Sequence, residues 1–230
     1  MPSFTDKLTV GGSDMDMYAA LPEGSGPHPA VVIAFHVGGL DDFDRKMADQ
    51  LADAGFVAVV PDLFHRFSKE VMDGPRLDRL GHLKDADIIS DMNAAVDFLT
   101  SNSAINNDRI GVTGFCMGGM LTLLIAAQEG NRVAAAAPFY GAPLGDSAPD
   151  WSGLTAAVEG HLAENDDFFP PEAINALGAE LRETGRDVVF HVYEGTGHGF
   201  ANEENPLGTW NEAAAATAWA RTVAFLGAHL

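Results

Sequence analysis

Apolar and polar residues alternate along this chain in a pattern that predicts a parallel β-sheet covered by helices. Continuous apolar stretches, as expected of strands buried on both faces, occupy residues 30–35, 56–60 and 133–138. Two further strands are expected at 109–113 and 188–193. Apolar residues spaced three or four apart predict helices between and after these strands, at residues 43–54, 85–99, 120–127, 171–183 and 209–228. Strands that alternate with helices in this way are typical of an α/β fold with helices on both faces of the sheet.

Two segments depart from this alternation. Residues 7–20 alternate weakly around Gly11 and Gly12, which predicts an N-terminal β-hairpin. Residues 62–84 form the only long segment without a clear period, and a segment of this kind in a compact domain is usually a functional cover. Because no linker composition interrupts the pattern, we predict a single α/β domain over residues 1–230, with 62–84 covering a pocket.

Composition narrows the classes of partner. The chain has 230 residues, of which 47% are hydrophobic, enough for a substantial core. Its 33 acidic and 13 basic residues give a formal net charge of −20, which argues against nucleic acid or an anionic membrane as a partner and is compatible with a salt-rich habitat. A single cysteine excludes an intrachain disulfide, and no signal segment or membrane span is recognisable, so we expect a cytoplasmic protein that acts on a small molecule. The oligomeric state is left open.

The single cysteine lies in the most informative motif of the chain. Residues 111–119 read Gly-Val-Thr-Gly-Phe-Cys-Met-Gly-Gly, between a predicted strand and a predicted helix. This is the nucleophile-elbow pattern G-x-S-x-G with Cys116 in the place of serine. Side chains two positions before and after the nucleophile would collide across the tight turn, and the helix that follows directs its first N–H groups at the reacting centre. The motif predicts Cys116 as a nucleophile, although a lone cysteine is more often a small buried hydrophobe.

An acid and a histidine complete a triad in the expected chain order. Asp166 follows the apolar segment 156–162, and His198 lies in a glycine-rich loop just after the strand predicted at 188–193. The order of nucleophile, acid and histidine is that of the α/β-hydrolase fold. His198 would accept the thiol proton while Asp166 fixes the tautomer of the imidazole. Asp167 is the alternative acid, and either aspartate could instead cap the helix that follows.

The remaining candidates lie near the predicted carboxyl ends of the strands. His36 ends the first long strand, and the loop after it is expected to supply the N–H of Val37 to an oxyanion hole completed by the N–H of Met117. His36 itself either contacts the cysteine or substrate or is a solvated residue at a strand end. Arg66 either holds an anionic substrate group or forms a surface ion pair. Aromatic candidates for the pocket wall include Phe115, Tyr140, Phe168 and Phe200, although any one such residue is more often part of the core than a ligand contact. None of the eight histidines has the spacing of a metal site, so no metal is predicted.

Four segments together resemble the dienelactone hydrolase family: 61–66, 114–119, 165–170 and 197–200. The resemblance extends over nearly the whole chain from residue 30. It implies an α/β-hydrolase fold and a Cys116–Asp166–His198 triad. It also implies hydrolysis of an ester or lactone through a cysteinyl acyl-enzyme, without a cofactor.

Two positions depart from the family pattern. Family members that act on lactones usually carry a glutamate where this chain has His36. They also carry an arginine that binds the substrate carboxylate where this chain has Asn202. A second family arginine is retained here as Arg66. The departures leave the substrate open.

Two other functions fit the same residues. A non-enzymatic binding or redox-sensing domain would use Cys116 as a reactive thiol, since a fold alone does not secure a function. An enzyme of this fold could also cleave thioesters or carbon–carbon bonds, and the sequence does not discriminate between these reactions.

Overall fold

A computed structural model describes residues 2–101, 105–128 and 132–230, with the side chains of 106–109 left out. Its centre is an eight-stranded sheet with the strand order β1-β2-β4-β3-β5-β6-β7-β8. The first two strands form an antiparallel hairpin that joins β4 in antiparallel fashion, and the remaining neighbours are parallel. The strands are β1 (Ser3–Val10), β2 (Ser13–Ala20), β3 (His28–Ala34), β4 (Val57–Pro61), β5 (Ile105–Phe115), β6 (Val133–Phe139), β7 (Ala157–Asn165) and β8 (Val188–Gly197).

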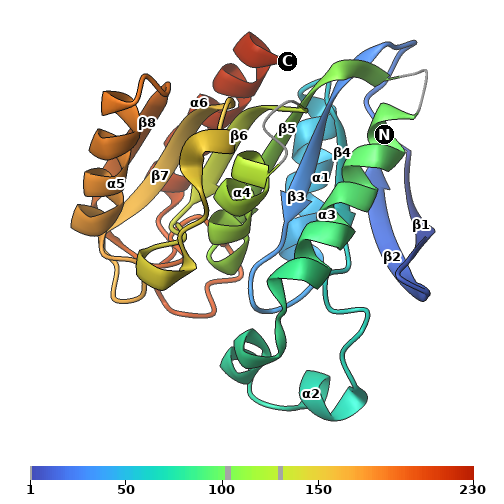
Figure 1. Ribbon diagram of the computed structural model, residues 1–230, viewed down its shortest axis with the longest axis horizontal. Helices are drawn as coiled ribbons and strands as arrows, with labels where there is room; N and C mark the ends of the chain where they lie inside the picture. The colour runs from blue at the N-terminus through green and yellow to red at the C-terminus, as the bar shows by residue number, and fades with distance from the viewer. Residues whose placement is uncertain (1, 102–104, 129–131) are drawn as a thin grey trace.

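Helices cover both faces of this sheet (Figure 1). One face carries α1 (Asp42–Asp53) and α6 (Glu212–His229), and the other carries α3 (Asp85–Thr100), α4 (Met117–Gln128) and α5 (Pro171–Glu183). The structure also describes three short 3-10 helices, η1 (Arg76–His82), η2 (Gly145–Ser147) and η3 (Trp151–Gly153). The prediction of an α/β fold with an N-terminal hairpin is confirmed.

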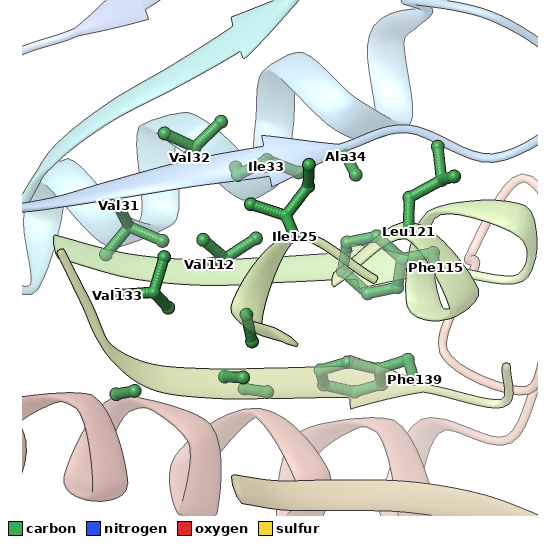
Figure 2. Packing of buried hydrophobic residues seen from close by; sticks show 14 of the residues in the cluster. Val31, Val32, Ile33, Ala34, Val112, Phe115, Leu121, Ile125, Val133 and Phe139 are labelled. Carbon is green, nitrogen blue, oxygen red and sulfur yellow. The ribbon is translucent and has the colours of Figure 1, made fainter. Parts of the chain in front are cut away.

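The core lies between β3, β5, β6 and the helix α4 (Figure 2). The β3 residues from Ala30 to Ala34 are fully buried, which explains their uninterrupted apolar run. Phe115 of β5 packs against Phe139 of β6 with ring centroids 4.8 Å apart. Leu121 of α4 is also buried in this cluster. Because α4 is apolar on almost every side, it is enclosed between the sheet and its neighbours, and the turn that precedes it is held rigidly.

The segment 62–84 is more regular than its sequence predicts. It contains the five-residue helix α2 (Lys69–Asp73) and the 3-10 helix η1. Ser68 caps α2 by accepting a hydrogen bond from the N–H of Val71, and both helices are too short to show an apolar period. The segment extends beyond one end of the sheet, as the position of α2 in Figure 1 shows.

Several boundaries also differ from the prediction. The last helix begins at Glu212 rather than at residue 209, because the side chain of Asn211 caps it by accepting a hydrogen bond from the N–H of Ala214. Strand β8 continues to Gly197, so His198 follows the strand directly. Within the residues that the structure describes, no helix has the length and apolar character to cross a membrane.

Candidate active site

Cys116 occupies a sharp turn between β5 and α4. Its backbone lies in the left-handed region, with φ of +58°, which is strained for a residue with a side chain. A Cβ atom at Gly114 would lie 2.3 Å from the carbonyl oxygen of Gly118, and one at Gly118 would lie 1.9 Å from that of Ala34. The glycines of the motif are therefore required by the close approach of backbone segments. The turn leaves Cys116 partly exposed and in the wall of a cavity.

His198 and Asp166 meet beside this turn. The Nδ1 atom of His198 lies 2.9 Å from Oδ2 and 3.1 Å from Oδ1 of Asp166. Oδ1 of Asp166 also accepts hydrogen bonds from the backbone N–H groups of Phe168 and Phe169, both at 2.9 Å, which fix the carboxylate. The neighbouring Asp167 is exposed. Of the two aspartates that the sequence leaves open, the structure brings Asp166 to the histidine.

The surroundings of His198 favour its charged form. Burial lowers the pKa of His198, but hydrogen bonds to Asp166 and Cys116, together with the negative charges of these groups, raise it to about 9. The rings of Phe168 and Tyr140 lie 4.8 Å and 5.1 Å from the imidazole. They exclude water from the imidazole, so the charge interactions with Asp166 and Cys116 are weakly screened.

Two backbone N–H groups border the same cavity. Val37 lies in the loop after β3, and Met117 is the first residue of α4; both line the cavity wall with Cys116. In the described part of the chain, neither N–H group has a hydrogen-bond acceptor. Both are therefore available to stabilise a negative oxygen.

A buried arginine holds the loop that carries Val37. Arg79 of η1 donates hydrogen bonds to the carbonyl oxygens of Val37 at 3.2 Å and Gly38 at 2.8 Å. It also donates to the carbonyl oxygen of Met72 at 2.6 Å and is only 7% exposed. The segment 62–84 thus supports the candidate oxyanion loop, a role that the sequence alone did not reveal.

His36 also lines the cavity, and its hydrogen bonds define its tautomer. Its Nδ1 accepts a hydrogen bond from the N–H of Gly38 at 2.9 Å, and its Nε2 lies 2.9 Å from Oδ2 of Asp41. A neutral imidazole with this pair of partners carries its proton on Nε2.

The potential ligand atoms of His36, Asp41 and Asp44 lie within 4.8 Å of one another, which is close enough to surround a cation. A metal ligand needs a free lone pair, and Nε2 of His36 is protonated in this arrangement, so the geometry does not favour a metal here.

The cavity has a volume of about 490 Å³ and is largely apolar. Five residues predicted to contact substrate line it: His36, Phe115, Tyr140, Phe168 and Asn202. Phe200 does not line the cavity but lies fully buried behind it, with its ring centroid 5.4 Å from that of Tyr140.

The placement expected for Arg66 is contradicted by the structure. Arg66 does not line the cavity; it pairs with the buried carboxylate of Asp91 on α3 and donates to the carbonyl oxygen of Val10 at 3.2 Å. Its ion pair with a buried acid ties the N-terminal hairpin to α3. The physical reason is that the turn after β4 directs this side chain toward the hairpin rather than toward the cavity.

Several cavity residues were missed because they lie in segments without a regular period. The η1 helix contributes Arg76, Leu77 and Leu80, and the loop before α6 contributes Leu207. Leu77 and Leu207 are 56% and 53% exposed and form an apolar rim. Arg76 has no ion pair or hydrogen bond to any other described residue. The only sequence signal for the missed residues of η1 was the prediction that residues 62–84 cover a pocket.

Comparison with known proteins places this chain in a family. The sequence profile of the dienelactone hydrolase family matches residues 15–230. The chain belongs to the dienelactone hydrolase family. A protein from Bradyrhizobium sp, described as a probable 2-oxo-3-(5-oxofuran-2-ylidene)propanoate lactonase, is 27% identical over 97% of this chain and 93% of its own length. Protein usf from Aquifex pyrophilus is 30% identical over 93% of both chains.

Solved structures of the family share the fold. A dienelactone hydrolase-like promiscuous phosphotriesterase from metagenomic libraries superposes with a TM-score of 0.85 at 23% identity, over 99% of this chain and 98% of its own. At this level of identity the likeness establishes the fold alone. The chemistry is argued from the residues of the site.

Proposed function

We propose that this chain is a hydrolase that cleaves a small ester or lactone through a Cys116–His198–Asp166 triad. The observation that carries the proposal is that His198, hydrogen-bonded to Asp166, lines the same apolar cavity as Cys116, and that both groups raise the pKa of His198. The name of the Bradyrhizobium relative, a lactonase, is consistent with this substrate class. The proposed reaction needs no cofactor, because an acyl transfer of this kind uses only a nucleophile, a base and oxyanion donors.

The residues divide the reaction into two stages. The imidazolium of His198 holds the proton given up by Cys116, and the thiolate attacks the carbonyl carbon of the substrate. The N–H groups of Val37 and Met117 stabilise the oxyanion. The imidazolium then gives its proton to the leaving oxygen, which releases the alcohol and leaves a thioester on Cys116. In the second stage His198 activates a water molecule that hydrolyses the thioester and restores the thiol.

The cavity also limits the substrate. Its wall is mostly apolar, and its rim carries the guanidinium of Arg76, which pairs with no other residue among those that the structure describes. A guanidinium binds a carboxylate through paired N–H donors. The preferred substrate is therefore a compact ester or lactone that also carries a carboxylate, which Arg76 would bind.

Turnover of short p-nitrophenyl esters and of small lactones tests the proposal. The Cys116→Ala variant should lose about 10³-fold or more of kcat/KM, the usual scale for loss of a triad member. Unchanged turnover in this variant contradicts the mechanism. A thiol that reacts with iodoacetamide in a protein without turnover on any ester would instead favour a thiol sensor.

A further inference from the structure

A carboxyl group beside the active site lies fully buried without a donor. Asp44, in the first turn of α1, is 0% exposed, and in the described chain neither of its oxygens has a hydrogen-bond donor. An isolated carboxylate in such surroundings is strongly destabilised, so buried acids of this kind usually take up a proton. The neighbouring residue Phe43 lines the cavity, which places Asp44 directly behind the cavity wall.

The nearest polar groups to Asp44 are another acid and the histidine at the end of β3. Its Oδ2 lies 3.8 Å from Nε2 of His36, which itself lies 2.9 Å from Oδ2 of Asp41. A carboxyl oxygen of Asp44 and one of Asp41 lie within 4.8 Å of each other and of the His36 ring nitrogen, and two buried carboxyl groups this close favour a state in which one of them carries a proton. Asp41 already accepts hydrogen bonds that favour its charged form, on Oδ1 from the N–H of Phe43 at 3.1 Å and on Oδ2 from His36, so Asp44 is the acid that carries the proton and can donate it toward Asp41.

The groups that surround Asp44 favour its protonated form. Burial raises the pKa of Asp44 well above its ordinary value, and the negative charges of Asp41 and Glu204 raise it further. Tyr140, which follows β6, also faces Asp44, and burial raises the pKa of Tyr140 well above its ordinary value, so it stays neutral. His36 is the only basic partner of Asp44 in the described residues, and its proton on Nε2 already points to Asp41.

The same hydrogen bonds continue into the candidate oxyanion loop. Nδ1 of His36 accepts from the N–H of Gly38, and the carbonyl oxygen of the same peptide unit, that of Val37, accepts from Arg79. The loop is therefore held between a guanidinium on one side and His36 with its two acids on the other. Hydrogen bonds in a chain of this kind polarise and strengthen one another.

We propose that Asp44 acts in its protonated form as a positioning residue, holding Asp41 and His36 so that the loop presents the N–H of Val37 to the substrate. This inference rests on the proposed function, in which Val37 is an oxyanion donor. Loss of the Asp44 proton would place two carboxylates at Nε2 of His36. The added negative charge would repel Asp41 and weaken its hydrogen bond to Nε2 of His36, which would loosen the hold of the ring on the N–H of Gly38.

The pH dependence of stability tests the protonation state without any substrate. A folded-state pKa raised above the unfolded value means that native Asp44 keeps a proton that the unfolded chain releases, so the contribution of Asp44 to stability is lost as pH rises above about 4. Asp44→Asn has the shape of the neutral acid and cannot ionise. Its denaturation midpoint relative to wild type should therefore rise between about pH 4 and pH 7. If Asp44→Asn fails to fold, Asp44→Ser, which keeps a hydroxyl donor, takes its place.

Asp42→Asn is the matched control, because Asp42 is on the same turn with a side chain that is 89% exposed. It should show no such trend. A midpoint difference for Asp44→Asn that stays constant or becomes more negative with rising pH would overturn the proposal, because it would mean that Asp44 is ionised and paired with a charged His36.

Kinetics test the positioning role. Asp44→Leu removes the donor to Asp41 and should lower kcat on p-nitrophenyl acetate by about 10-fold or more, with a smaller change in KM, since one oxyanion donor is worth about 10²-fold. Asp44→Asn, whose amide can donate to Asp41, should recover most of that loss. Wild-type kcat in folded Asp44→Leu would overturn the positioning role. Failure of the proposed function is seen separately, as unchanged turnover in Cys116→Ala, and would leave the stability trend intact.

Discussion

The positive charge on His198 depends on Asp166, and the size of the effect of removing the Asp166 carboxylate can be predicted. A pKa of about 9 lies above the ordinary histidine value of 6.5. At about 1.4 kcal/mol per pH unit, this difference corresponds to about 3 kcal/mol of preference for the imidazolium. Because burial alone would lower the pKa, Asp166 and Cys116 together supply more than this amount. In Asp166→Asn the imidazole should therefore be neutral at pH 7 and free to adopt the wrong tautomer.

The expected result is a loss of about 10²- to 10⁴-fold in kcat/KM at pH 7, the scale seen when the acid of a triad becomes an amide. The assay is p-nitrophenyl acetate hydrolysis from about pH 5 to pH 10, with circular dichroism to confirm folding. Asp167→Asn is the matched control, since this neighbouring carboxylate is exposed, and it should behave as wild type. Activity of Asp166→Asn within about threefold of wild type would refute the reasoning.

The same pKa predicts a stability effect with a defined sign. A histidine whose pKa is raised by folding adds stability that is fully present below about pH 6.5 and is lost as pH rises through about 9. The unfolding free energies of wild type and Asp166→Asn should therefore converge at alkaline pH. A difference that widens above about pH 9 would contradict the assignment of charge to His198.

Three further substitutions test separate parts of the account. Arg76→Ala should raise KM about 10-fold for esters that carry a carboxylate and leave KM for neutral esters unchanged, measured by steady-state kinetics. Gly118→Ala should unfold the elbow, because its Cβ would lie 1.9 Å from the carbonyl oxygen of Ala34, and thermal denaturation should show a loss of several kcal/mol. Arg66→Met should leave KM unchanged but destabilise the protein by about 1–3 kcal/mol, because it removes one of the two described partners of the buried Asp91 carboxylate and leaves only His65, at 3.1 Å, as urea denaturation would show.

Each of these three predictions would be contradicted by a specific result. An equal change in KM for anionic and neutral esters would remove Arg76 from substrate recognition. A Gly118→Ala variant with wild-type stability would show that the elbow can relax. A rise in KM for Arg66→Met without loss of stability would restore the substrate role that its ion pair with Asp91 argues against.

The sequence predicted the parts of this protein that follow local rules. The strand β3 reads as an apolar run because both of its faces are buried, and the glycines around Cys116 follow from backbone contacts within one turn. Strands of a parallel sheet end at the same edge, so the chain order of nucleophile, acid and histidine was enough to predict that Cys116, Asp166 and His198 lie at one edge of the sheet. These features depend on short segments and on the topology of the fold.

The remaining parts of the site depend on which way individual side chains turn. Arg66 and Arg79 lie in the same irregular segment, yet only Arg79 reaches the loop after β3, while Arg66 turns to the hairpin. Asp44 reads as an ordinary polar residue in the first turn of a helix, and its burial follows from the packing of α1 against the cavity wall. Tertiary packing decides such orientations, and one sequence carries no periodic signal for them.

The central claim is that the sulfur of Cys116 becomes acylated during turnover. Intact-protein mass spectrometry after rapid acid quench of a reaction with a slowly hydrolysed p-nitrophenyl ester tests it most directly. The account predicts one acyl group per chain, located by peptide mapping on Cys116 and absent from Cys116→Ala. Steady turnover with no acyl group on Cys116, or an acyl group on another residue, would contradict it.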